Sequence, residues 1–323
     1  MTALYQVEGL RVDMLLPGGL IPFARPPRLN ILDGISLTVN GGETFGLVGE
    51  SGSGKTTLAR AMLGLVPATG TLRFRDAPLS ETSLRRGTAM MFQDAVASLS
   101  PRMQVGALIT EPYAIHRIPR AERASAGELL SRVGLPPAMA ARYPHELSGG
   151  QARRVCAARA LALNPALVIA DEPTAGLDVS IQGDILNLMA DLKRDRGIAF
   201  LIITHNLSVL RHTADRIAVL YLGRLVETGP AAQVFARPLH PYTASLIASE
   251  PNPDPRLRRA DLAIRGEIPG LLRRPAGCVF HTRCPLAEAR CRSDPPALRE
   301  IAPGRSLRCH LAGQDTTTER TPT

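Results

Sequence analysis

A glycine-rich segment with one central lysine is the first place in this sequence where chemistry is expected. Residues 49–57 read Gly-Glu-Ser-Gly-Ser-Gly-Lys-Thr-Thr, after an apolar run and before a stretch with apolar residues at helical spacing. Glycines let backbone N–H groups turn inward around phosphate oxygens, and a helix N-terminus adds partial positive charge. This context predicts a phosphate-binding loop rather than an ordinary turn. Its predicted nucleotide-binding residues are Gly49, Ser51, Gly52, Gly54, Lys55, Thr56 and Thr57.

Individual side chains in and beyond this loop have distinct expected tasks. Lys55 is expected to reach the β- and γ-phosphates of a nucleotide, and the Thr56 hydroxyl to ligate Mg²⁺. Residues 167–172, LVIADE, predict a buried strand that ends in two carboxylates. Asp171 is placed to hold Mg²⁺ and Glu172 to polarise an attacking water. Because strand ends of a parallel sheet meet at one edge, both motifs would face one nucleotide.

The order of elements predicts the fold that positions these motifs. Strand-like runs alternate with helical ones, which is typical of an α/β fold with a largely parallel sheet. Residues 13–30 hold many Pro and Gly and are expected to form a loop, and about 95–162 to form an inserted helical lobe. After about residue 236 Pro, Arg and Cys increase and regular periodicity fades. The sequence therefore predicts a domain over 1–235 and a C-terminal extension over 236–323, with a disordered tail from about 314.

Leu147-Ser-Gly-Gly-Gln151, at the start of a predicted helix, resembles the signature of ABC ATPases. In that family the signature of one subunit closes over the ATP that the other subunit holds, again a helix N-terminus offered to a phosphate. Gln93 resembles the Q-loop glutamine, Asp178 completes a segment similar to the D-loop, and His205 resembles the switch histidine. The resemblance covers about residues 4–235. It implies a P-loop cassette with a mostly parallel core sheet, an antiparallel β subdomain and an inserted helical subdomain.

The resemblance also implies roles for these residues. The expected catalytic residues are Glu172, His205 and Gln93; the further nucleotide ligands are Ser148, Gly149, Gly150, Gln151 and Asp178; and the Mg²⁺ ligands are Thr56, Gln93 and Asp171. Two departures stand out. The signature continues with Ala152-Arg153-Arg154 where relatives usually carry Arg-Gln-Arg, with little consequence expected, and Asn206 follows the switch histidine where most relatives have Asp.

Flanking segments narrow the resemblance to the oligopeptide/dipeptide importer ATPases. ASLSPRM at 97–103, YPHELSGGQ at 143–151, DVSIQ at 178–182 and HPYT at 240–243 are similar to that family, and SPRM with Glu111-Pro112 favours its F-type over its D-type subunit. The resemblance implies an ATPase that powers import of di- or oligopeptides by ATP-driven dimerisation with a second, different cassette. Its implied partners are two permeases and an extracytoplasmic solute-binding protein, and its implied place is the cytoplasmic face of the inner membrane, as a peripheral subunit.

Other functions remain open at this point. Similar ATPases import nickel, metallophores or glycosides, and a soluble ABC ATPase acting on nucleic acid or ribosomes is a more distant alternative. The latter usually has two cassettes or long insertions, whereas one compact cassette is present here. The net charge of +9 comes from Arg spread along the chain, without a basic run interleaved with aromatics, so no nucleic-acid partner is expected. Apolar runs are strand-sized, and the start lacks a signal-peptide pattern, so a cytosolic chain is expected.

Four of the five cysteines lie close together in the C-terminal extension, with the spacing Cys-x₅-Cys-x₆-Cys-x₁₇-Cys. In a cytosolic chain such a group indicates a metal site rather than disulfides, and the C-x₂-C pairs of zinc ribbons are absent. The importer family carries a [4Fe–4S] cluster in this extension in some members. The expectation is therefore a [4Fe–4S] cluster on Cys278, Cys284, Cys291 and Cys309. Zn²⁺, with His281 and His310 as further candidate ligands, and unligated thiols are the alternatives.

Overall fold

The computed structural model describes residues 2–15, 28–250 and 266–311. The chain forms two compact units, each built from three separate stretches. The first comprises Met1–Gln6, Thr38–Phe45 and Leu72–Ile203, and the second comprises Val7–Leu37, Gly46–Thr71 and Thr204–Thr323. The disordered tail expected from about residue 314 lies outside the described residues.

A parallel sheet forms the core of the first unit. Its strands are β6 (Thr88–Met91), β7 (Leu167–Asp171) and β8 (Ala199–Ile203), followed by the start of β3 (Thr44–Val48). Every residue of β3, β7 and β8 is buried, which explains their continuous apolar runs, because a parallel sheet is covered on both faces. The register pairs Met91 with Ala170 and Asp171 with Ile203, so the three strands end at the same edge.

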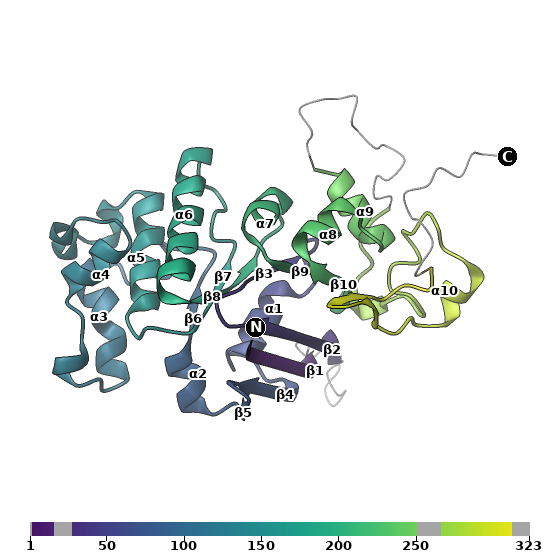
Figure 1. Cartoon of the computed structure of the whole chain (residues 1–323), viewed down its shortest axis with the longest axis horizontal. Coiled ribbons are helices and arrows are strands. Elements are labelled where there is room, and N and C mark those ends of the chain that lie inside the picture. Colours follow the sequence, from purple (N-terminus) through teal and green to yellow (C-terminus); the bar gives the residue numbers. More distant parts are fainter. Residues whose placement is uncertain (1, 16–27, 251–265, 312–323) are drawn as a thin grey trace, which may run out of the picture. The chain divides into compact units, whose positions relative to one another are not determined.

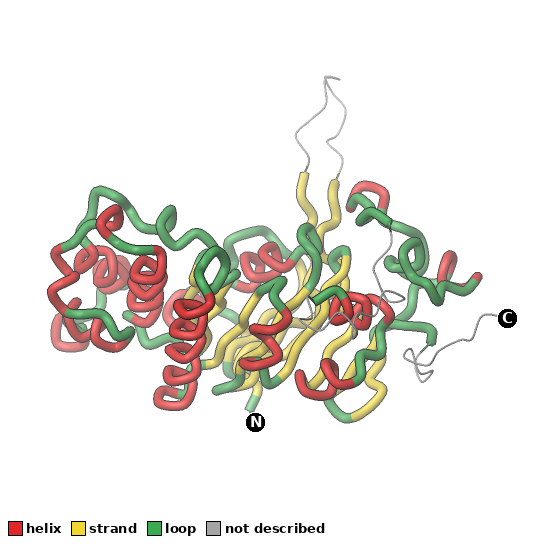
Figure 2. Tube along the Cα trace, turned by 90° about the horizontal axis from the view of Figure 1, so that it is seen from above, coloured by secondary structure: helices red, strands yellow, loops and turns green. Residues whose placement is uncertain are grey.

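The rest of the first unit is mainly helical. Its helices are α2 (Glu81–Gly87), α3 (Val105–Ile115), α4 (Ala126–Arg132), α5 (Gly149–Leu161) and α6 (Val179–Arg196). Single 3₁₀ turns separate α3, α4 and α5, at Arg120–Glu122, Pro137–Ala141 and Pro144–Glu146. A proline lies at or just before the start of each turn, where its fixed φ and missing N–H are tolerated. The part built from α3, α4 and α5, blue to teal in Figure 1, contains helices and loops but no strand in Figure 2.

A second, four-stranded sheet has the order β2-β1-β4-β5. Its strands are β1 (Ala3–Leu15), β2 (Arg28–Asn40), β4 (Thr69–Phe74) and β5 (Ala77–Pro78). Both ends of the loop expected over 13–30 are strand instead, because β1 continues to Leu15 and β2 begins at Arg28; residues 16–27 lie outside the described residues. The sequence did not indicate these strand ends, because the stretch is rich in Pro and Gly and the last residues of β1 are exposed and give no apolar alternation.

Antiparallel strands and short helices form the rest of the second unit. The strand order is β11-β12-β10-β9-β3, with β9 (Arg216–Tyr221), β10 (Arg224–Pro230), β11 (Arg299–Ala302) and β12 (Arg305–Leu307). The helices are α1 (Lys55–Met62), α7 (Leu207–Thr213), α8 (Ala231–Ala236), α9 (Pro241–Ala248) and α10 (Ala289–Ser293). Within the described ranges, none of the helices combines the length and apolar character that a membrane crossing requires.

The C-terminal extension is more regular than its composition suggested. Strand β12 pairs with β10, with Glu227 opposite Leu307, and β11 pairs with β12, so the extension lengthens the antiparallel sheet. Helix α9 adds a further regular element. Strands of three and four residues are too short to give a periodic signal.

Candidate active site

The glycine-rich loop lies between β3 and α1 in the second unit, in the strand–loop–helix order expected. At Gly49 an added Cβ would lie 2.2 Å from the carbonyl oxygen of Leu220, so only glycine fits. Gly54 caps α1 with φ of 104°, a left-handed conformation that glycine adopts without strain. Local geometry therefore holds the loop against the sheet and exposes Ser51 and Gly52 at its tip.

Lys55 is the first residue of α1 and is buried. Its Nζ donates to the carbonyl oxygens of Gly49, at 2.7 Å, and Glu50, at 2.9 Å. The ammonium therefore lies inside the loop, beside the helix N-terminus. Thr56 and Thr57 follow on the first turn and are half-buried. A positive charge surrounded by loop backbone at a helix N-terminus is the arrangement that binds phosphate groups.

The two carboxylates expected at the end of β7 are both buried in the first unit. Asp171 is the last strand residue, and Glu172 follows with φ of 50°, in the left-handed region that a non-glycine residue rarely adopts. The backbone N–H of Glu172 donates to the carbonyl oxygen of Ile203 at 2.7 Å. Strain of this kind persists only where the surroundings impose it, and it is concentrated at functional sites.

Arg153, on the signature helix α5, contacts the backbone at and after Glu172. Its Nη1 donates to the carbonyl oxygens of Glu172, at 3.0 Å, and Pro173, at 2.8 Å, and its Nη2 donates to that of Ala175. Burial lowers the pKa of Arg153, and nearby acidic groups oppose that shift. These hydrogen bonds tie the signature helix to the backbone around Glu172, a contact that the sequence alone did not indicate.

Gln93 lies two residues beyond the end of β6 and is exposed. Because Met91 pairs with Ala170, this glutamine leaves the sheet next to the strand that ends at Asp171. The first unit thus brings the Q-loop candidate and the two carboxylates to one edge of the sheet.

The signature and D-loop candidates form two neighbouring helix N-termini in the first unit. Ser148 caps α5 by accepting from the Gln151 N–H at 3.3 Å, and Asp178 caps α6 by accepting from the Ile181 N–H at 3.0 Å. A Cβ added at Gly150 would lie 2.7 Å from Ile181 Cγ2, so the helices pack closely at this point. Ser148, Gly149 and Asp178 nevertheless remain exposed, and Val179 beside them is 85% exposed.

His205 follows β8 and is exposed at the start of the last stretch of the second unit. Asn206 caps α7, and its Oδ1 accepts from the N–H groups of Ser208, at 3.0 Å, and Val209, at 3.4 Å. An aspartate could cap the helix in the same way. The departure at Asn206 therefore preserves the local hydrogen bonding next to the switch-histidine candidate.

The four cysteines of the extension are partly or fully buried and free of disulfides. The backbone N–H of Cys278 donates to the Cys291 carbonyl oxygen at 2.9 Å. Burial, with a smaller contribution from neighbouring thiols, raises the pKa of Cys284 to about 12 and that of Cys309 to about 11. These surroundings favour the neutral thiol.

The predicted [4Fe–4S] cluster on Cys278, Cys284, Cys291 and Cys309 is wrong. Among the residues that the structure describes, all four cysteines included, no group of three or more His, Cys, Asp or Glu side chains could hold a metal ion. The same finding contradicts the zinc alternative. The physical reason is that a metal site needs three or four ligands gathered around one point, which these side chains do not provide, while strand pairing and buried ion pairs hold the extension in place. Spacing in the sequence suggested a shared ion, but the described fold does not arrange these thiols as a group that could hold one.

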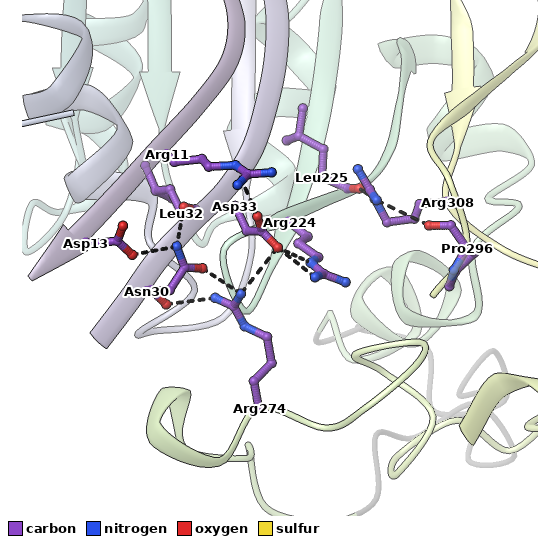
Figure 3. A network of polar contacts seen from close by, with 10 residues as sticks. All are labelled: Arg11, Asp13, Asn30, Leu32, Asp33, Arg224, Leu225, Arg274, Pro296 and Arg308. Carbon is purple, nitrogen blue, oxygen red and sulfur yellow. Dashed lines mark hydrogen bonds and ion pairs between the residues drawn. The ribbon is translucent and has the colours of Figure 1, made fainter. Parts of the chain in front are cut away.

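Arginines fasten the extension to the rest of the second unit (Figure 3). Arg274 of the extension donates to the side-chain and backbone oxygens of Asn30 on β2, at 2.7 and 2.8 Å. Next to it, Asp33 Oδ2 accepts from Arg224 at 2.6 Å and lies 3.7 Å from Arg274, while its Oδ1 lies 3.6 Å from Arg11. Burial alone would raise the pKa of Asp33, but Arg224, Arg274 and Arg11 hold it below its usual range.

A second attachment is fully buried. Arg305 Nη2 on β12 donates to Glu227 Oε1 on β10 at 2.8 Å, and these side chains are 8% and 0% exposed. Glu227 also accepts from the backbone N–H groups of Leu239 and His240. The extension therefore depends on ion pairs, strand pairing and buried apolar residues such as Phe280 and Leu307.

This fold and these motifs define a P-loop ATPase of the ABC class. The ABC transporter family matches residues 32–175, and the "Oligopeptide/dipeptide transporter, C-terminal region" family matches residues 226–291. The chain is 45% identical over 320 residues to the "Probable peptide ABC transporter ATP-binding protein y4tS" of Sinorhizobium fredii, covering 96% of this chain and 90% of that protein. It is 44% identical to the "Oligopeptide transport ATP-binding protein AppF" of Bacillus subtilis, covering 87% of this chain and 89% of that protein.

A solved structure gives the same result at the level of the fold. The ATP-binding cassette MJ0796, a dimer in a post-hydrolysis state bound to ADP and Pi, has a TM-score of 0.60 and 26% identity, covering 70% of this chain and 98% of that one. The chain belongs to the ATP-binding proteins of the ABC transporter family, in its oligopeptide/dipeptide branch. The expected fold class and the expected ATPase activity are thereby confirmed.

Proposed function

We propose that this ATPase powers an importer of di- or oligopeptides. The observation that carries the proposal is the 45% identity to a peptide ABC transporter ATP-binding protein over 96% of the chain. This identity includes the C-terminal extension, and residues 226–291 match a family described for oligopeptide and dipeptide transporters. The SPRM stretch and Glu111-Pro112 favour assignment to the F-type subunit.

In this function the phosphate loop binds the nucleotide. Gly49, Ser51, Gly52 and Gly54 shape the loop, whose N–H groups bind phosphate oxygens together with Lys55 and the hydroxyls of Thr56 and Thr57. The buried position of Lys55 at the start of α1 supports its role. A phosphate oxygen can replace the carbonyl oxygens to which its ammonium now donates.

Hydrolysis requires a base, and Glu172 is the proposed one. The left-handed backbone of Glu172 and the hydrogen bond that its carbonyl oxygen accepts from Arg153 support this role, because they fix the residue that carries the carboxylate. Gln93 and His205 are proposed to sense the γ-phosphate. Thr56, Gln93 and Asp171 carry the hydroxyl, amide and carboxylate oxygens that Mg²⁺ prefers, and Mg²⁺ would neutralise phosphate charge.

A second cassette completes the site in this proposal. Ser148, Gly149, Gly150 and Gln151 of each cassette bind the nucleotide of the other, with Asp178 at the seam. The exposure of Ser148, Gly149 and Asp178, beside an 85% exposed Val179, supports an interface at these helix N-termini. The partners are a different cassette, two permeases and an extracytoplasmic solute-binding protein, at the cytoplasmic face of the inner membrane.

The test is reconstitution of the chain with its partner cassette and permeases in lipid vesicles. ATP hydrolysis is expected to rise when the binding protein is added with peptide, and labelled peptide is expected to accumulate. Stimulation by nickel, a metallophore or a glycoside, and not by peptide, would contradict the peptide assignment. The Lys55→Ala chain in the same complex serves as the control for transport that depends on this site.

A further inference from the structure

The C-terminal extension contacts the phosphate loop itself. Arg283 Nη1 donates to Glu50 Oε2 at 2.6 Å, and its Nη2 donates to Glu50 Oε1 at 3.0 Å. The Arg283 side chain is 5% exposed and that of Glu50 is 22% exposed. A guanidinium that binds both oxygens of a carboxylate in a sheltered place is a strong and directional contact.

Glu50 is the second residue of the phosphate loop, and its backbone is bound on both sides. Its N–H donates to the hydroxyl of Tyr242 at 2.9 Å. Its carbonyl oxygen accepts from Lys55 Nζ at 2.9 Å and from the Ser53 N–H at 3.2 Å. A movement of Glu50 would therefore move the groups that surround the lysine ammonium.

Arg283 is in turn held from the side of the extension. The Arg283 N–H donates to the carbonyl oxygen of Phe280 at 3.0 Å, which closes a tight turn. Phe280 packs with Tyr221 and Tyr242, at ring-centroid distances of 5.2 and 5.3 Å. The guanidinium carbon of Arg283 lies 5.8 Å from the centre of the Tyr221 ring. This aromatic cluster gives the guanidinium a rigid base.

We propose that Arg283 is a positioning residue for nucleotide binding: it fixes the carboxylate of Glu50 and thereby holds the phosphate loop in the shape that accepts phosphates. The proposal rests on the proposed function of residues 49–57 as the nucleotide-binding loop. It gives the extension a task in the ATPase reaction, because the extension supplies a contact that the loop does not make by itself.

The two other arginines that attach the extension contact residues outside the phosphate loop. Arg274 reaches Asn30 on β2, and Arg305 reaches Glu227 on β10. Both hold the extension in place, whereas Arg283 ends on the phosphate loop. Loss of Arg305 should therefore affect the stability of the extension, and loss of Arg283 should affect the nucleotide.

The experiment measures the Kd of the full-length chain for MgATP by calorimetry. Arg283→Gln is expected to raise this Kd about tenfold, the factor that corresponds to a charge-assisted hydrogen bond. Glu50→Gln should act in the same direction, and Arg283→Lys should restore part of the affinity. The double variant should bind no more weakly than the weaker single variant, because both changes remove one shared contact. In the reconstituted complex, KM for ATP should rise while kcat changes little.

Two matched controls separate positioning from folding. Arg290→Gln removes an exposed arginine of the same extension, paired with Glu288 at 3.0 Å, and should leave both Kd and melting temperature unchanged. Arg305→Gln should lower the melting temperature and leave the Kd unchanged. If Arg283→Gln does not fold, Arg283→Lys and Glu50→Gln decide the question, since each keeps one partner of the pair in place.

An unchanged Kd in folded Arg283→Gln and Glu50→Gln chains, or effects of the two changes that add in the double variant, would overturn the role of Arg283. A wild-type chain that does not bind MgATP, or a Lys55→Ala chain that binds it equally well, would instead overturn the proposed function of the loop.

Discussion

The phosphate loop and the C-terminal extension belong to the same unit but are held in place in different ways. Inside the loop the lysine is held by residues close in sequence, since Lys55 donates to carbonyl oxygens five and six residues before it, and the Arg283–Glu50 pair adds one contact from the extension. The extension is organised by contacts between distant residues, 244 positions apart for Arg274 and Asn30 and 78 for Arg305 and Glu227. Substitutions in the motifs should therefore change ATP binding or hydrolysis and leave the free energy of unfolding nearly constant. Substitutions in the arginine attachments should lower the free energy of unfolding and leave ATP hydrolysis nearly constant.

The largest effect is expected where chemistry alone is removed. Glu172→Gln should lower ATP turnover by about 10²–10⁴-fold, because general-base assistance is lost while the side chain keeps its shape. ATP binding should persist. Phosphate release and nucleotide affinity are measured in parallel, with Glu288→Gln, an exposed carboxylate of the extension, as the control. Turnover near the wild-type rate would exclude Glu172 as the base.

The second prediction concerns stability and removes the buried ion pair between Glu227 and Arg305, which attaches the extension. Glu227→Gln should lower the free energy of unfolding by about 3–5 kcal/mol, because the buried guanidinium of Arg305 loses its carboxylate. Urea denaturation measures the change. Glu288→Gln, which removes an exposed partner of Arg290, should stay within about 0.5 kcal/mol of the wild type. Equal stability of the two variants would show that the buried pair does not hold the extension.

A smaller effect is expected in the phosphate loop, on the affinity for MgATP. Lys55→Ala should weaken MgATP binding about ten- to a hundredfold, which corresponds to the loss of hydrogen bonds to a charged group. Lys193 is the only other lysine of the chain and lies on α6, so Lys193→Ala is the matched control. Similar affinities of both variants would contradict the phosphate-binding role of Lys55.

The smallest predicted effect is a pH dependence that belongs to the extension. Burial lowers the pKa of His240 to about 3, against an ordinary value of 6.5. The unfolded chain therefore binds an extra proton below pH 6.5, and the free energy of unfolding should fall by about 1 kcal/mol between pH 6.5 and 5.5.

His240→Asn tests this origin, because asparagine can still accept the hydrogen bond from the Tyr242 N–H that His240 Nδ1 accepts at 3.0 Å. Urea denaturation at both pH values should show a flatter dependence for the variant. An equal slope in the wild type and the variant would assign the acid sensitivity to another group.

The motifs of the ATPase could be located from the sequence because each is a local pattern. The loop at 49–57, the strand ending at Asp171 and the helix opened by Ser148 all lie in the predicted context, since strand, turn and cap preferences act over a few residues. The same kind of reasoning was wrong for the cysteines. The spacing shows that the thiols are near in sequence, and whether they form a group that could hold an ion depends on backbone paths that spacing does not report.

The sequence by itself determined the ABC class, the order of the motifs and the residue types at the phosphates. Only the tertiary structure decided which contacts hold these residues. They are the hydrogen bonds from Arg153 to the backbone at Glu172, the left-handed backbone of that glutamate, and the contact of Arg283 with Glu50. These contacts join residues 19 and 233 positions apart. No local preference encodes such pairs, because they form only when packing of the whole unit brings a buried charge to its partner.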